Sequence, residues 1–433
     1  MKNVPEVSGD LDPTFGSGGI VPMPFQGVIE NVPTAVCGRP DDSLFVAIRA
    51  PALVGAPSAL AKLDQRGRLD TAYADQGIKK FDFADGFFDP QEIINLSGGG
   101  CAVVGKAVRG FNDEFAVYKL IASGQSDPSF GQAGKIVILP QDLIDPIADA
   151  AAVSACRESA KAKVGSTTAL GAVVNDAGKM YVAGTMFLRG VYRGFIVCLE
   201  EDGTPSSSFN GGGCVIVDPY SPYLQCYAHD IAVLPDGRVL ACGFCYGASG
   251  RGNAGYIACY DKTGRKDLSF GVNGMVVVEE TGIDVLESLT ASAQGKIFAS
   301  GTANGAGLIL ALKESGTFDD EFNGGQPLIA SLPGLLANIT WLRCHLHDDG
   351  GGKIVVAGVA DGDGGAVSLV TARYLSDAEI DLTYAGRGWN AVDDSRGRDV
   401  YAGSTLMTDK RVVLGGTLLM GQPVESYLRR YSA

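Results

Sequence analysis

The stretch Ser126-Asp127-Pro128-Ser129-Phe130-Gly131-Gln132-Ala133-Gly134 recurs along the chain in looser copies, and it decides the fold. An Asp that opens a turn can accept hydrogen bonds from backbone N–H groups two or three residues further on. The glycines that follow allow positive φ, and the aromatic ring supplies a large apolar surface to bury. The stretch therefore predicts a turn with a buried aromatic wedge, which is a structural joint and not a site of chemistry.

Seven copies of this motif can be counted, at intervals of 52 to 79 residues. Each copy is marked by an aromatic residue: Phe15, Tyr73, Phe130, Phe209, Phe270, Phe322 and Tyr384. Three residues before the aromatic, the fourth copy has Ser206 and the others have an Asp: Asp12, Asp70, Asp127, Asp267, Asp319 and Asp381. A fixed period of this length is typical of repeat architectures, in which each repeat is one supersecondary unit.

Each repeat contains four short apolar runs separated by turn residues. One of these runs ends in glycine, as at Gly184, Gly243, Gly301, Gly358 and Gly415, whereas the first repeat has Ile48 there. With 60 glycines and few helix-like periods, the chain is predicted to be all-β with many tight turns. Four short strands per repeat are the pattern of a β-propeller blade.

The two ends of the chain complement each other. After Tyr384 only 49 residues remain, and the segment up to Phe15 has 15, so together they make about one repeat. A ring closed by pairing of the N- and C-terminal segments would join these parts and hide the sheet edges. The sequence therefore predicts a seven-bladed β-propeller with four-stranded blades, forming a single domain over residues 1–433.

The third repeat departs from the period through an insertion at about residues 141–170. Asp145-Pro146 could cap a helix, and residues 148–161 have the composition of one. We expect the insertion to form an elaborated loop on one face of the ring.

The sequence repeat resembles that of a known family. Leu11-Asp-Pro-Thr-Phe-Gly-Ser-Gly-Gly19 and Asp267-Leu-Ser-Phe-Gly-Val-Asn-Gly274, paired with Val-Ala-Gly runs, are similar to the delta-60 repeat of bacterial proteins. The resemblance covers nearly the whole chain apart from the insertion. It implies a β-propeller, and it implies no common activity and no catalytic residues.

Composition limits the partners and the compartment. The net charge of −14 would repel nucleic acid and anionic lipid. No run approaches the roughly 18 apolar residues of a membrane-spanning helix. Residues 1–8 lack the apolar core of a Sec signal peptide, so the expected location is the cytoplasm, or outside the cell by a non-Sec route.

Cysteine usage indicates thiols that are mostly reduced, because ten cysteines are too sparse for a disulfide scaffold. Cys242-Gly-Phe-Cys245 has redox spacing, but it does not lie at the start of a predicted helix, where such a motif gains its reactivity. We interpret these cysteines as small buried residues, with a disulfide or a zinc site as the alternative.

Histidines offer one candidate metal site. In Trp341-Leu-Arg-Cys-His-Leu-His-Asp348, strict alternation would place Trp341, Arg343, His345 and His347 on one strand face. Two histidines at i and i+2 can chelate a metal, with Asp348 or Asp349 as a third ligand. We prefer the simpler interpretation, a polar strand face at the end of a blade, because nothing in the sequence places further ligands; no metal site and no cofactor are expected.

Two long hairpins on neighbouring repeats concentrate aromatic and arginine residues, the types enriched at binding hot spots. The candidate binding residues are Phe187, Arg189, Tyr192, Arg193, Phe244, Tyr246 and Arg251. The alternative is that these side chains pack on one another at the rim of the ring.

The leading functional hypothesis is a non-catalytic binding propeller that recognises a protein or a glycan through loops on one face. One alternative is an enzyme with a carboxylate- or metal-based site in the central channel. Another is a toxin or envelope component exported without a Sec signal.

Overall fold

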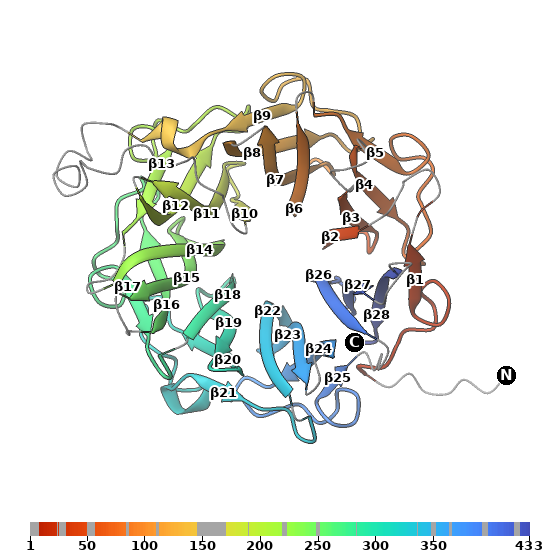
Figure 1. Ribbon diagram of the computed structural model, residues 1–433, viewed down its shortest axis with the longest axis vertical. Coiled ribbons are helices and arrows are strands. Elements are labelled where there is room, and N and C mark those ends of the chain that lie inside the picture. The colour runs from red at the N-terminus through yellow and green to blue at the C-terminus, as the bar shows by residue number, and fades with distance from the viewer. Residues whose placement is uncertain are drawn as a thin grey trace. The chain divides into compact units, whose positions relative to one another are not determined.

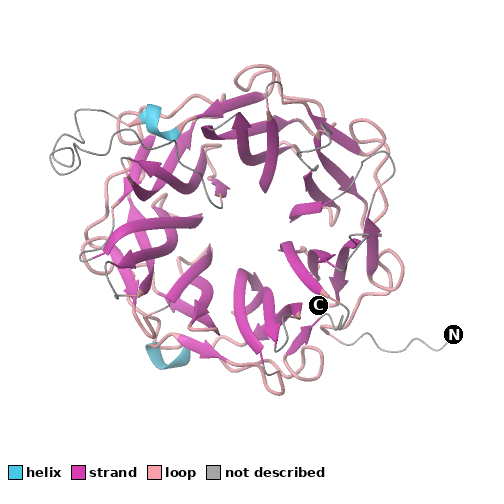
Figure 2. Cartoon of the chain, in the orientation of Figure 1, coloured by secondary structure: helices cyan, strands magenta, loops and turns pink. Residues whose placement is uncertain are grey.

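The computed structural model describes residues 8–433 except 24, 26–31, 50–56, 84–85, 110–111, 145–169, 189, 219–222, 248–251, 283, 336, 348–351, 363–365, 392–396 and 420–424. These residues form β-strands joined by turns, with two short 3-10 helices, η1 (Pro140–Leu143) and η3 (Asn323–Gly325) (Figure 2). The all-β prediction is confirmed. No helix in this part of the chain is long and apolar enough to cross a membrane. The helix expected over residues 148–161 lies outside the described residues.

The chain divides into two compact units. One comprises Met1–Asp82, Ser300–Ala311 and Phe318–Ala433, and the other comprises Phe83–Ala299 and Leu312–Thr317.

Most described strands belong to four-stranded sheets, in which neighbours in sequence pair antiparallel (Figure 1). Five such sheets are described: β2 (Val32–Gly38), β3 (Leu44–Arg49), β4 (Ser58–Leu63) and β5 (Ile78–Phe81); β6 (Phe87–Asn95), β7 (Cys101–Arg109), β8 (Asn112–Leu120) and β9 (Lys135–Ile138); β10 (Gly171–Val174), β11 (Met180–Leu188), β12 (Val191–Leu199) and β13 (Cys214–Val217); β14 (Tyr223–Val233), β15 (Val239–Gly247), β16 (Asn253–Tyr260) and β17 (Met275–Val278); and β18 (Asp284–Ala291), β19 (Ile297–Ala303), β20 (Ala306–Leu312) and β21 (Leu328–Ala330).

The remaining sheet has eight strands and consists of two groups of four. The groups are β22 (Ala337–His347), β23 (Lys353–Gly362), β24 (Val367–Tyr374) and β25 (Trp389–Ala391), and β26 (Arg398–Leu406), β27 (Val412–Leu419), β28 (Glu425–Tyr431) and β1 (Ile20–Met23). A single parallel residue pair, Val367 with Arg398, joins the two groups.

The fourth strand of the last group comes from the start of the chain. β1 lies antiparallel to β28, with Ile20 opposite Arg429 and Met23 opposite Ser426 (Figure 1). The same two chain segments also form a buried ion pair, in which Arg430 Nε lies 2.6 Å from Asp12 Oδ2. The first and last segments of the sequence therefore share one sheet and one buried charge pair.

The repeated motif forms a joint between consecutive sheets. All seven motif aromatics are at most 2% exposed. In the third copy, Asp127 Oδ1 accepts hydrogen bonds from the Ser129 N–H and hydroxyl at 2.9 and 2.6 Å, as the turn chemistry predicts. The next residue, Gly131, donates its N–H to Asp202 O in a turn of the following sheet at 2.8 Å.

The same bond recurs in other copies, where the residue after the aromatic donates to a turn of another sheet. The donor and acceptor pairs are Gly16 and Arg66, Asn210 and Thr263, Gly271 and Ser315, Asn323 and Asp377, and Ala385 and Ser8. The recurrence of this hydrogen bond explains why the motif is the most regular part of the sequence.

The recurrent glycines have a different role from the one expected, since they do not end a strand. Gly243 lies within β15, opposite a β-bulge in β14 between Ala228 and Asp230. A bulge kinks its strand, and a Cβ at Gly243 would collide with the carbonyl oxygen of Tyr227. Gly105 and Gly358 face bulged strands in the same way. Nothing in the structure explains why the first repeat has Ile48 at this place.

Gly243→Ala is therefore expected to lower the free energy of unfolding by about 1–3 kcal/mol, the cost of overpacking a filled site. Gly98→Ala is the matched control, because a Cβ at Gly98 meets no atom within 4 Å. Urea unfolding of both variants checks the prediction, and equal midpoints would contradict it.

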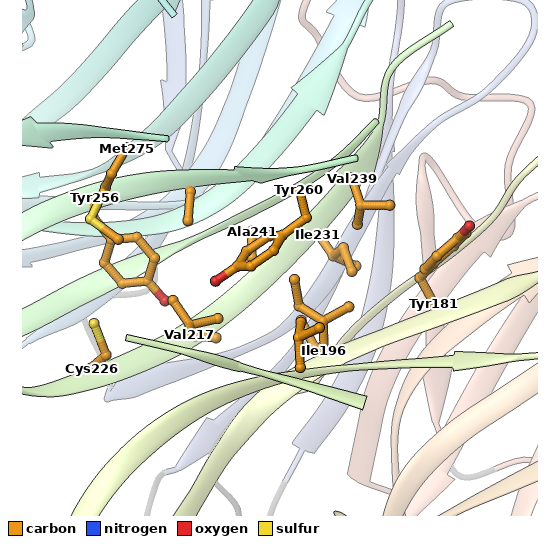
Figure 3. Packing of buried hydrophobic residues seen from close by; sticks show 14 of the residues in the cluster. Tyr181, Ile196, Val217, Cys226, Ile231, Val239, Ala241, Tyr256, Tyr260 and Met275 are labelled. Carbon is orange, nitrogen blue, oxygen red and sulfur yellow. The ribbon is translucent and has the colours of Figure 1, made fainter. Parts of the chain in front are cut away.

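Within each unit, apolar clusters lie between the faces of neighbouring sheets. Figure 3 shows one such layer, in which Ile196 and Val217 pack with Ile231, Val239, Tyr256 and Tyr260. This layer joins the β10–β13 sheet to the β14–β17 sheet and positions the strands that carry the candidate site.

Candidate functional site

Four aromatic rings form a continuous strip across two neighbouring sheets. Phe187 of β11 and Tyr192 of β12 meet edge to face, with centroids 5.1 Å apart. Tyr192 stacks on Tyr227 of β14 at 5.1 Å, and Tyr227 stacks on Phe244 of β15 at 4.5 Å with nearly parallel planes. We call Phe187, Tyr192, Tyr227 and Phe244 the aromatic strip.

Strand register builds the strip. Phe187 lies opposite Tyr192 across β11 and β12, and Tyr227 lies opposite Phe244 across β14 and β15. Directly opposed residues in an antiparallel pair have side chains close enough for their rings to touch. Only the Tyr192–Tyr227 contact is made between sheets, so it depends on tertiary packing.

Polar groups accompany the rings. The Gln225 side-chain oxygen accepts from the Tyr192 N–H at 3.3 Å and from the Tyr227 hydroxyl at 3.4 Å. The Arg193 guanidinium donates to Leu224 O at 2.8 Å. Gln225 thus holds two members of the strip together by hydrogen bonds.

Part of this region is open to solvent. The strip residues are half-buried, and beside them Tyr246 is 49% and Leu224 is 53% exposed. Tyr246 lies opposite Gln225 across β14 and β15. The strip and these neighbours therefore present an accessible surface with both ring and hydrogen-bonding groups.

An ionisable pair borders the strip. The His229 ring contacts Phe244 with centroids 5.4 Å apart, and His229 Nδ1 lies 2.8 Å from Glu287 Oε2. Burial by itself would lower the pKa of His229, but the Glu287 carboxylate outweighs burial and raises it above the usual value. The stabilisation that protonated His229 gains from Glu287 is fully present below the unfolded pKa of histidine, about 6.5. It is lost as the pH rises through the higher pKa of the folded state.

Four of the seven predicted binding residues lie in the strip or next to it: Phe187, Tyr192 and Phe244 are members, and Arg193 follows Tyr192 on β12. Tyr246 lies at the edge, and Arg189 and Arg251 lie outside the described residues. The rings do pack on one another, as the alternative interpretation held, yet they stay partly exposed.

Sequence reasoning missed Tyr227, Gln225 and His229. They occur two residues apart on β14 and alternate with the small buried residues Cys226 and Ala228, and this alternation was the signal that could have identified them.

A second polar cluster lies in the other unit. His345 Nε2 and Ser404 Oγ are 2.8 Å apart, and the Tyr401 hydroxyl donates to Ser404 Oγ at 2.8 Å. Burial, aided by the Arg343 charge, lowers the pKa of His345 to about 4, so its ring is neutral at pH 7. This arrangement pairs a hydroxyl with a neutral base.

The predicted four-residue strand face around His345 is wrong in one respect. Trp341 lies opposite Gly358 and Arg343 lies opposite Ala357, because a bulge intervenes in β22. Trp341 and Arg343 therefore point to opposite faces, whereas Arg343, His345 and His347 share one. Trp341 is fully buried in the core.

The described residues do not supply a set of ligands for the candidate metal site at His345 and His347. Within the described residues, no group of three or more His, Cys, Asp or Glu side chains is placed to hold a metal ion. Asp348 and Asp349, the expected third ligands, lie outside that part of the chain.

Two surface cavities in the second unit lie away from the strip. One of about 820 Å³ is lined by Asp218, Tyr260 and Lys266, and one of about 490 Å³ by Lys119, Asp127 and Phe130. In the smaller cavity, Lys119 and Asp127 are ion-paired at 3.2 Å. This smaller cavity lies beside the third copy of the motif, and none of the predicted site residues lines it.

Comparison with known families supports the fold. Residues 178–209 and 352–384 match a family described as a beta-propeller domain of unknown function, DUF5122. Each match contains the second and third strands of a sheet and the following motif, ending at Phe209 and at Tyr384. The fold is of the β-propeller type.

Many solved structures are similar, with 207 matching chains. Polysaccharide lyase Uly1 is 9% identical, with a TM-score of 0.51 over 94% of this chain and 91% of that one. Prolyl oligopeptidase B from Galerina marginata, bound to a macrocyclization substrate, is 12% identical, with a TM-score of 0.39 over 94% of this chain and 48% of that one. No curated protein matches the sequence. At 9% identity, the likeness to the lyase shows the fold alone.

Proposed function

We propose that this protein is a non-catalytic binding propeller that recognises a glycan at the aromatic strip. The observation that carries the proposal is the run of half-buried, solvent-accessible rings from Phe187 through Tyr192 and Tyr227 to Phe244. Rings supply a large, rigid contact area at low cost in conformational entropy.

A glycan suits this surface better than a protein does. The apolar C–H face of a sugar ring can pack on an aromatic face, and its hydroxyl groups need nearby hydrogen-bonding partners. Gln225, Arg193 and the Tyr227 hydroxyl are such partners. Since a protein of this fold acts on polysaccharide, polysaccharides are the first probes to use.

We further propose that the sheets are seven blades of one closed ring and one domain, built from repeats of the delta-60 type. The pairing of β1 with β28 and the division of the eight-stranded sheet into two groups of four support this proposal. An experimental structure with six or eight blades would contradict it.

The binding proposal is tested with a glycan array followed by calorimetry on the best soluble ligand. Tyr246→Ala is expected to weaken binding at least tenfold, about 1.4 kcal/mol, because it removes an exposed ring beside the strip. Leu268→Ala is the control, since Leu268 is 68% exposed and belongs to a motif joint.

Recognition of a protein instead of a glycan would leave the binding function in place but change the class of ligand. The absence of any glycan binding, or equal affinities of Tyr246→Ala and the unaltered protein, would refute glycan recognition at this surface.

A second candidate is an enzyme that uses the His345 cluster. The contact between His345 Nε2 and Ser404 Oγ has the geometry of a base beside a hydroxyl. If this is the function, His345→Ala abolishes turnover of ester or glycoside substrates while Tyr246→Ala leaves it unchanged. Activity that persists in His345→Ala would exclude the cluster.

A further inference from the structure

Two cysteine thiols face each other below the aromatic strip. Cys226 of β14 lies opposite Cys245 of β15, and their sulfur atoms are 2.7 Å apart. That separation is shorter than the optimal contact of nonbonded carbon atoms, about 3.5–4.0 Å, and approaches a disulfide bond of about 2.05 Å. Both residues are at most 1% exposed.

The pairing differs from the one that sequence spacing favours. Cys242 and Cys245 have CxxC spacing, but both lie on β15 three residues apart. Residues at odd separations on a strand point to opposite faces. Cys242 lies opposite Asp230, away from Cys245, so the partner of Cys245 comes from the neighbouring strand.

We propose that Cys226 and Cys245 form a cross-strand disulfide when the protein meets a small-molecule disulfide such as oxidised glutathione. One thiolate attacks the oxidant, a thiol leaves, and the second thiolate attacks the mixed disulfide. The new bond joins the two sulfur atoms, the oxidant takes up two electrons and the two thiol protons, and two molecules of its thiol form.

Burial governs when the reaction occurs. It raises the pKa of the Cys226 thiol well above the usual value, and the neighbouring Cys245 reinforces the effect. The thiolate is therefore scarce in the folded state. The bond forms during folding in an oxidising buffer, or when the β14–β15 hairpin opens.

The disulfide would stiffen the strands that carry the strip. Cys226 and Cys245 are immediate sequence neighbours of Tyr227 and Phe244, the closest stacked pair. Closing a loop of this kind restricts the unfolded chain and stabilises the folded one. This inference does not depend on the proposed glycan.

The test refolds the full chain from urea in a buffer of reduced and oxidised glutathione, blocks remaining thiols by alkylation and maps the unreduced digest by mass spectrometry. The expected product is a linked peptide pair containing Cys226 and Cys245, lighter than the two thiol peptides by two hydrogen atoms. The thermal midpoint should exceed that of the reduced protein by on the order of 5 °C.

Cys242→Ala is the matched control and should keep both the linked peptides and the rise, whereas Cys226→Ala should lose both. Recovery of Cys226 and Cys245 as alkylated thiols from the refolded protein would overturn the proposal. A bond between Cys245 and Cys242 would overturn it as well.

Discussion

Arg430→Ala is expected to lower the free energy of unfolding by about 3–5 kcal/mol, the cost of removing the closest partner of a buried charge. Arg430 Nε lies 2.6 Å from Asp12 Oδ2, and both side chains are at most 3% exposed. The guanidinium also donates to Thr14 Oγ1 at 3.0 Å and lies over the Phe15 ring at 4.6 Å. One substitution therefore removes both the closest cation of Asp12 and the guanidinium that packs on Phe15.

Thermal or urea unfolding measures this loss, and Arg68→Ala serves as its control. Arg68 is paired with Asp64 at 2.7 Å, but its side chain is 69% exposed, so a change within about 0.5 kcal/mol is expected. A loss of less than about 1 kcal/mol for Arg430→Ala would mean that the pair between the two ends of the chain is dispensable.

The same pair predicts a pH dependence. Burial by itself would raise the pKa of Asp12, but hydrogen bonds from Thr14 and the charges of Arg430 and Arg411 together hold it below the usual 3.8. A carboxylate with a lowered pKa stabilises the fold above its unfolded pKa, and this contribution is lost as the pH falls through the folded value. The difference between Arg430→Ala and the unaltered protein should therefore shrink in acid.

Phe130→Ala is expected to cost about 3–5 kcal/mol, because it empties a filled site in the core. Phe130 is 1% exposed and belongs to the apolar cluster between the β6–β9 and β10–β13 sheets. A Cβ at Gly203 would come within 2.9 Å of its ring, so the turn of the next sheet rests directly on Phe130. Removing the ring loosens the joint that Gly131 and Asp202 close by their hydrogen bond.

Leu268→Ala is the appropriate control, since it is also a motif residue but is 68% exposed. Urea unfolding should show a large loss for Phe130→Ala and almost none for Leu268→Ala. Similar small losses for the two variants, below about 1 kcal/mol, would show that the motif is a surface feature.

The repeated joint was predictable because its physics is local. Asp127 accepts from Ser129 two residues away, and Gly131 and Gly134 adopt positive φ, so residue type alone limits the conformation. The alternation of short apolar runs and turns is local in the same sense. These features predicted an all-β chain of four-stranded units.

Bulges were not predictable, and they changed two interpretations. A single extra residue in β22 moved Trp341 to the other face from Arg343, and a bulge in β14 placed the backbone of Tyr227 against Gly243. A bulge depends on how two strands fit each other, and neither strand carries that information alone.

Local pattern thus determined the motif turns and the strands, because their hydrogen bonds depend on residues nearby in the sequence. Tertiary packing decided that Tyr192 stacks on Tyr227, that Cys245 meets Cys226 instead of Cys242, and that Arg430 pairs with Asp12. Each of these contacts joins separate strands or sheets. Their partners lie 19 to 418 residues apart in sequence, so only the register and packing of the folded chain bring them together.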